Sequence, residues 1–314
     1  MLGTLAVGYL FLGGAGAGAI VVASGLDLAL VRAPFGTDAR VSVDEAPPCE
    51  RVAAFALLAG FAALALGVLC LLFDLGRIDR VLDLFLRPSP TYLTVGSFAL
   101  AVLAACGAFL TLVRLAYLPS VPRAAAVAVE AVAVAVGLVV MVYTGLLLQG
   151  LGAVALWRSP FVPVLFTLSS LSCGSALVLA AAQLTGAASA FATVLGRLAV
   201  VDAVVIVLEA AALAVFAGTA LAGVGGDFVV GRTAEALAAS AEALVAGEAA
   251  WLFWGGLVLA GLAVPFALDV ILARLRRPRP AIALVAAACV LAGGLAMRYC
   301  VVEAGMHPLL AMAS

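Results

Sequence analysis

Charged residues are scarce in this sequence, and their scarcity excludes an ordinary soluble domain. Only 11% of the 314 residues are charged and 67% are hydrophobic, whereas a soluble globular domain has about 25% charged residues. The mean hydropathy of +1.30 indicates several membrane-spanning helices. The formal net charge of −1 provides no basic surface for nucleic acid. We therefore expect a polytopic protein surrounded by a lipid bilayer.

Histidine is almost absent, and no two cysteines are spaced for a metal site. The one histidine, His307, cannot supply both axial ligands of a bis-histidine haem. The six cysteines stand singly, without the C-x-x-C spacing of zinc or iron–sulfur sites. We therefore expect no haem and no metal bound by this protein, so that a redox role would need another cofactor.

Long apolar runs predict the fold class, because about 20 apolar residues cross the hydrocarbon core as a helix. Eight runs of this kind lie at residues 5–31, 52–73, 92–117, 124–148, 161–184, 198–222, 249–272 and 281–302. We predict one all-α membrane domain over residues 1–314, with eight transmembrane helices in two four-helix bundles. The first run is expected to remain as an uncleaved span. A short surface helix is expected over residues 233–245, with Glu235 and Glu242 on the side that faces water.

The arginines predict the orientation in the membrane. All sixteen basic residues are arginines; ten lie at or near the loops after the odd-numbered spans and five at the opposite loops. By the positive-inside rule both termini are extracytoplasmic. The start of the first span, Asp74, Tyr143 and Arg298 then lie toward the outer face.

Tyr143 and Thr144 lie near the outer end of the fourth span. Two hydroxyl groups at the rim of an apolar slot would suit a lipid-soluble ligand with ring oxygens, and Trp157 and Arg158 follow at the same face. The alternative is a tyrosine of the aromatic belt, which needs no ligand.

Glycines and an acid add two further features at this face. Gly14 and Gly18 are four residues apart in the first span, so another helix or a flat ligand can approach its backbone closely. Helix packing is the simpler interpretation, and a ligand wall is the second. Asp74 ends an apolar helix three residues before Arg77. One interpretation is that the two side chains form an ion pair at the membrane interface. The other is that the Asp74 carboxylate is functional, because burying an unpaired carboxylate at this depth in the membrane is costly. Both interpretations stay open.

Buried acids indicate proton handling in the second half of the chain. Asp202 and Glu209 share a helix face, and a carboxylate near the bilayer centre costs about 2.5–3.5 kcal/mol on insertion scales. Arg298 either snorkels to the interface or pairs with an acid such as Glu209. Glu130 is a further proton-path candidate, although helix-end solvation is the simpler account of both Glu130 and Asp269.

Five motifs, in this order along the sequence, resemble the NrfD/PsrC family of membrane subunits. They are Tyr9–Gly14, Asp74–Arg77, Tyr143–Leu147, Leu156–Pro160 and Gly293–Tyr299. The resemblance implies a haem-free subunit of the bacterial inner (cytoplasmic) membrane. Such a subunit exchanges electrons between quinone, here expected to be menaquinone, and a ferredoxin-like iron–sulfur subunit, often with a molybdopterin catalytic subunit.

The resemblance also implies roles for single residues. Tyr143 corresponds to the tyrosine that forms a hydrogen bond with a quinone oxygen, and Asp74 corresponds to the acid of the second motif. Both residues are expected to have catalytic roles. The quinone site predicted in this way consists of Gly13, Gly14, Asp74, Arg77, Tyr143 and Thr144. The alternative is a secondary transporter, because glycine-broken helices and buried carboxylates also mark substrate pathways. An anchor without a catalytic pocket is a third possibility.

Overall fold

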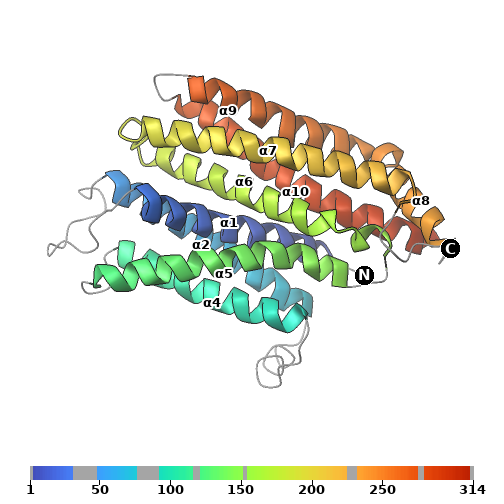
Figure 1. The fold of residues 1–314 in the computed structure, drawn as a ribbon, viewed down its shortest axis with the longest axis horizontal. Helices are drawn as coiled ribbons and strands as arrows, with labels where there is room; N and C mark the ends of the chain where they lie inside the picture. Colours follow the sequence, from blue (N-terminus) through green and yellow to red (C-terminus); the bar gives the residue numbers. More distant parts are fainter. Residues whose placement is uncertain are drawn as a thin grey trace.

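The computed structural model describes residues 3–30, 48–75, 92–115, 121–150, 154–224, 232–274 and 279–311. All regular structure in these ranges is helical (Figure 1), and eight helices there are long and apolar enough to cross a membrane. They are α1 (Thr4–Leu30), α2 (Pro48–Leu75), α4 (Tyr92–Arg114), α5 (Arg123–Gly150), α6 (Phe161–Leu184), α7 (Ala192–Leu221), the continuous η2 (Leu252–Ala263) and α9 (Val264–Arg274), and α10 (Pro280–Ala311). The all-α class and the eight spans are confirmed.

Two helices are longer than the apolar runs predicted. α7 begins at Ala192 rather than at residue 198, and α10 continues to Ala311 rather than ending at residue 302. The added turns contain charged residues such as Arg197 and Glu303. Because helical hydrogen bonds join backbone groups, the helix continues where the apolar side chains end.

The predicted surface helix is present as α8 (Arg232–Ala246). Leu237, Ala241 and Leu244 are buried on its inner face, whereas Glu235 and Glu242 are exposed. The amphipathic pattern of the sequence therefore placed both the helix and its wet side correctly.

The seventh span departs from regular α-helical geometry. Leu252–Ala263 forms the wider π-helical turns before α9 continues the span, although π turns are rare and mostly single. Within it, Gly261 lies against Gly293 of α10 so closely that a Cβ on either residue would meet the other backbone. Two spans therefore touch backbone to backbone where the π-helical segment ends.

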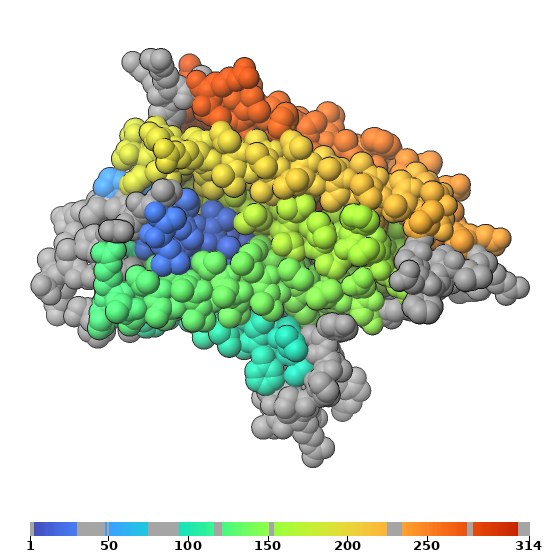
Figure 2. Space-filling model, viewed as in Figure 1, coloured from blue at the N-terminus to red at the C-terminus, as the bar shows by residue number. Residues whose placement is uncertain are grey.

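α1 is the central helix of the molecule. It contacts α2, α5, α6 and α10, and 78% of its spanning segment is buried, against 28% for α2. Figure 2 shows α1 at the surface over part of its length, between α5 and α7. Gly16 and Gly18 permit this packing, because Cβ atoms there would collide with the backbones of α2 and α6.

The helices present two ends. The start of α1 and the end of α10 lie at the same end of the molecule (Figure 1); we call it the Tyr143 end, and the opposite one, where α4 finishes, the Arg114 end. α6 contacts α1, α2 and α5 as well as α7 and α10, and so joins the first and second halves of the sequence. The division into two four-helix bundles and the outward orientation of both termini stay predictions.

Candidate functional site

Tyr143 lies inside the bundle rather than at the rim of an open slot. It is 4% exposed, and its ring occupies space that Gly96 of α4 leaves free, since a Cβ on Gly96 would overlap the ring. The hydroxyl group of Tyr9 on α1 interacts with that of Tyr143. Within the described ranges, however, the Tyr9 hydroxyl has no partner at hydrogen-bond distance. Because a buried polar group without a partner is costly, the Tyr9–Tyr143 pair can take a further acceptor.

Thr144 does not contribute the second hydroxyl group of this pair. The side chain is fully buried, and its Oγ1 donates to the backbone oxygen of Met141 at 2.7 Å. This bond within one helix turn is a usual way to satisfy a threonine hydroxyl in a helix. The structure therefore joins Tyr143 to Tyr9, and the Thr144 proton is used within α5.

Protein atoms fill the space beside the two glycines that were predicted as a ligand wall. A Cβ on Gly14 would lie 2.8 Å from Nη2 of Arg298. A Cβ on Gly67 of α2 would lie 2.8 Å from the backbone nitrogen of Gly13. Gly14 thus makes room for an arginine, and Gly67 lets α2 approach the backbone of α1 at Gly13. A Cβ on Gly13 itself would lie 3.4 Å from the ring of Tyr9.

Asp74 lies at the Tyr143 end but farther from the core. It is exposed at the end of α2, and its Oδ1 would lie 3.2 Å from a Cβ on Gly3. Tyr9 follows Gly3 by six residues, which corresponds to about 9 Å along a helix. Arg77, the predicted ion-pair partner of Asp74, lies outside the described residues.

Arg298 on α10 is fully buried, with no exposed surface. Its five N–H groups all donate to acceptors on α1, α6 and α10: Leu10 O (3.0 Å), Ser169 Oγ (3.1 Å), Gly294 O (2.9 Å), Phe166 O (3.5 Å) and Ser170 Oγ (2.8 Å). An arginine has five such donors, so none is left over. The rings of Phe11 and Phe166 lie 5.7 and 5.3 Å from the guanidinium carbon, within the range of cation–π contacts. Arg298 therefore does not snorkel to the interface.

Polar side chains continue from Arg298 into α7 and α9. Ser169 accepts a hydrogen bond from Arg298 and interacts with Glu209, which is 5% exposed and also feels the charge of Arg298. Asp202 precedes Glu209 by seven residues of α7, and it interacts with Glu209 and with Asp269 of α9. Asp202 and Asp269 are each 1% exposed. The expected helix-end solvation of Asp269 is therefore wrong, because the helices around it shield it from water.

Comparison with known proteins identifies the family of this protein. Residues 1–309 match the protein family described as polysulphide reductase, NrfD. The protein belongs to the NrfD family. It is also 29% identical over 311 residues to the C subunit of polysulfide reductase from Wolinella succinogenes, an alignment that covers 95% of this sequence and 92% of that relative. The resemblance drawn from the five motifs is confirmed.

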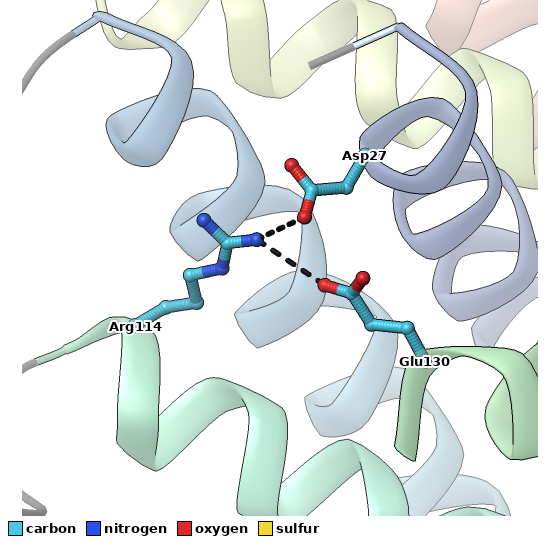
Figure 3. A network of polar contacts seen from close by, with 3 residues as sticks. All are labelled: Asp27, Arg114 and Glu130. Atoms are coloured by element: carbon cyan, nitrogen blue, oxygen red, sulfur yellow. Dashed lines mark hydrogen bonds and ion pairs between the residues drawn. The ribbon is translucent and has the colours of Figure 1, made fainter. Parts of the chain in front are cut away.

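The NrfD-family protein has a second buried polar cluster at the Arg114 end (Figure 3). Nη2 of Arg114 on α4 lies 2.5 Å from Oδ2 of Asp27 on α1 and 3.2 Å from Oε1 of Glu130 on α5. The three side chains are 3%, 8% and 1% exposed, in that order. Glu50, in the first turn of α2, interacts with Arg114 and Asp27. One arginine thus connects three helices directly and lies near a fourth.

Glu130 is therefore buried, and the expectation of helix-end solvation is wrong for it as well. Its interactions are with Asp27 and Arg114, and it precedes Tyr143 by thirteen residues of α5, or about 20 Å of helix. The structure joins Asp202, Glu209 and Arg298 in one polar set, but it places Glu130 in the other cluster.

Several polar residues of this NrfD-family protein were not singled out by the sequence. Tyr9 belongs to the first of the five motifs but was given no role of its own, and Asp27 lies in a run of apolar residues. Ser169, Ser170 and Ser172 interrupt the apolar sequence of α6. A group of hydroxyls in a span was an available signal, since each must find a partner where water is absent.

Proposed function

We propose that this protein is the haem-free membrane subunit of a respiratory oxidoreductase complex, in which it binds quinol at the Tyr143 end and passes electrons to an iron–sulfur subunit. Membership of the NrfD family supports the respiratory complex. The name of the relative, the C subunit of polysulfide reductase, is that of one component of a larger enzyme. The family resemblance adds a ferredoxin-like partner, a molybdopterin catalytic subunit, menaquinone and the bacterial inner membrane.

The Tyr9–Tyr143 pair is the observation that carries the quinol site. Two phenol groups, one of them without a hydrogen-bond partner in the described structure, face each other inside an apolar bundle. Each can donate to a quinone carbonyl or accept from a quinol hydroxyl. The residues present therefore fit the polar edge of a quinone head group.

Bound quinol would supply two electrons and two protons to the complex. Tyr143, fixed between α1 and α4, would orient the ligand oxygen, and Tyr9 would hold it from the other side. Asp74, exposed at the same end, would take up a released proton and pass it to water. The electrons would leave this subunit for the partner, because the described residues include no group of three or more histidine, cysteine or acidic side chains that could hold a metal.

We assign proton handling inside the membrane to the set formed by Asp202, Glu209, Ser169 and Arg298. The Ser169 hydroxyl lies between the guanidinium and the Glu209 carboxyl, so it can orient the carboxyl group that takes up or releases the proton. Arg298 bonds the carbonyl of Leu10, the residue next to Tyr9. This set therefore reaches α1 one residue away from the tyrosine pair. Glu130 is left out of the assignment, because it belongs to the Arg114 cluster.

Purification in mild detergent tests the proposed role. Iron and acid-labile sulfide are measured, and mass spectrometry identifies copurifying subunits and bound quinone. We expect a cysteine-rich ferredoxin-like subunit and a quinone in the preparation. An intact protein that carries neither, and that moves a solute across proteoliposomes by itself, would replace the proposal with the secondary transporter.

A further inference from the structure

Three buried oxygen atoms without partners lie together between α6, α7 and α9. They are Oγ of Ser172, Oδ1 of Asp202 and Oδ2 of Asp269, and none has a hydrogen-bond partner in the part of the protein that the structure describes. The three residues are 2%, 1% and 1% exposed. Asp202 interacts with both Ser172 and Asp269, so its carboxyl group lies next to both of these side chains. Buried oxygens of this kind are normally satisfied by a bound water or ion.

Two ionised carboxyl groups would leave the surroundings of these oxygen atoms with excess negative charge. Among the described residues, the ion pairs found are those at the Arg114 end, so neither Asp202 nor Asp269 forms one there. Two carboxylates that face each other away from water, with no cation between them, are strongly unfavourable. At least one positive charge, shared between the two carboxyl groups, is therefore needed to relieve this repulsion.

The neighbouring titratable groups do not supply that charge. Asp202 interacts with Glu209 on its own helix and with Cys173 on α6. Neither a carboxyl group nor a thiol can provide a positive charge. Arg298 on α10 interacts with Glu209, but its five donors are bonded elsewhere. The titratable group that α9 contributes next to Asp202 is Asp269 itself, which is also an acid.

We propose that Ser172, Asp202 and Asp269 form a binding site for one hard monovalent cation, either Na⁺ or a proton shared among these oxygens. Carboxylate and hydroxyl oxygens are the ligands that hard cations prefer. Both ions meet the same need, because each adds a single positive charge and engages oxygens that otherwise lack partners. The inference rests on the proposed function only in that Asp202 belongs to the proton-handling set; binding of the ion needs neither quinone nor partner subunit.

A groove between α7 and α9 connects the site with the Arg114 end. Asp269 lines this groove together with Val204 and Phe266, and the lining continues to Ala273 and Arg274 at the end of α9. Between Asp269 and Arg274 the lining is apolar, so this groove brings the site within five residues of the charged end of α9.

Thermal unfolding of the purified protein tests the site without electron transfer. The midpoint is measured with NaCl replaced stepwise by choline chloride at constant ionic strength, and at several pH values without Na⁺. A ligand that binds only the native state raises the midpoint as its concentration rises. We expect the midpoint to rise with Na⁺ if the ion is sodium, or to rise as the pH is lowered, with no sodium effect, if it is a proton.

Variants decide whether the response belongs to this site. If the ion is sodium, Asp269→Asn is expected to abolish the rise of the unfolding midpoint with Na⁺. If it is a proton, the same change is expected to reduce the rise of the midpoint at low pH to the part that other titratable groups cause. Glu242→Gln, on the exposed face of α8, makes the same change of charge and should respond as the wild type does. If Asp269→Asn does not fold, Ser172→Ala keeps both carboxylates and should weaken ion affinity several-fold. A wild type that responds to neither ion, or variants that respond as fully as the wild type, would overturn the proposal.

Discussion

Arg298 on α10 donates from Nε to the backbone carbonyl of Leu10 on α1, at 3.0 Å. This bond joins residues 288 positions apart in the sequence, and it lies one residue from Tyr9 on the central helix. The other four donors of the same side chain bond to α6 and α10. A single buried charge therefore fixes the arrangement of three helices behind the proposed quinol site.

Replacement of Arg298 by lysine should strongly destabilise the protein. Lysine keeps the charge but has three donors at one point, so acceptors at five places cannot all be satisfied. Each buried acceptor left without a partner costs about 1–3 kcal/mol. We expect the free energy of unfolding in detergent to fall by several of these increments, whereas Arg123→Lys, at an exposed position, should change little. Equal stability of the two variants would contradict the account of Arg298.

Gly18 and Gly25 of α1 provide a matched pair of alanine substitutions. A Cβ on Gly18 would overlap the backbone oxygen of Ser170 on α6, whereas a Cβ on Gly25 would meet nothing within 4 Å. We expect Gly18→Ala to destabilise by about 1–3 kcal/mol and Gly25→Ala to stabilise by about 0.5–1 kcal/mol through helix propensity. Chemical unfolding of both variants in the same detergent checks the difference. If Gly18→Ala did not destabilise the protein relative to Gly25→Ala, α1 and α6 would not be packed so closely.

Replacement of Arg114 by methionine should expose the role of the cluster at the opposite end. The change leaves Asp27 and Glu130 buried without the guanidinium that both contact. Loss of one partner from a buried ionic cluster costs about 3–5 kcal/mol. A variant that also carries Asp27→Asn and Glu130→Gln should recover most of this loss, because the uncompensated charges are gone. If the triple variant is as unstable as Arg114→Met, the charge balance is not what stabilises this end.

Replacement of Glu209 by glutamine should slow proton handling without affecting assembly. The amide keeps the size of the side chain and can still bond to Ser169, but it cannot exchange a proton. We expect quinol-dependent turnover of the complex, and the protons taken up with it, to fall roughly tenfold or more. Glu242→Gln serves as the control on the exposed face of α8. Unchanged turnover and proton stoichiometry in Glu209→Gln would remove this residue from the route.

The sequence predicted the architecture well because a membrane demands long apolar runs. All eight spans were found, and the five motifs led to the right family. The ends of α7 and α10 were missed because charged residues such as Arg197 and Glu303 end an apolar run without ending a helix. The π-helical segment from Leu252 to Ala263 could not be foreseen, since its composition is that of an ordinary span.

Most pairings of polar residues from different helices were not predicted. Tyr143, Glu209 and Arg298 stood out because each is unusual in an apolar helix, but their partners come from other helices. Nothing local distinguishes Tyr9 as the neighbour of Tyr143. In the same way, Asp269 looked like a solvated helix end, although α7 covers it with Asp202. Such pairings depend on the rotation of whole helices about their axes, which packing in three dimensions determines.

The most direct measurement of the central claim is the quinol-dependent turnover of the complex that carries Tyr143→Phe. This change removes one hydroxyl from the Tyr9–Tyr143 pair and keeps the ring that packs against Gly96. Tyr299→Phe, at a residue of α10 that is 39% exposed, is the matched control, and recovery of all subunits shows that assembly is intact. We predict that Tyr143→Phe loses most of its quinol-dependent activity while Tyr299→Phe keeps it. Full activity in an assembled Tyr143→Phe complex would contradict a quinol site at this pair.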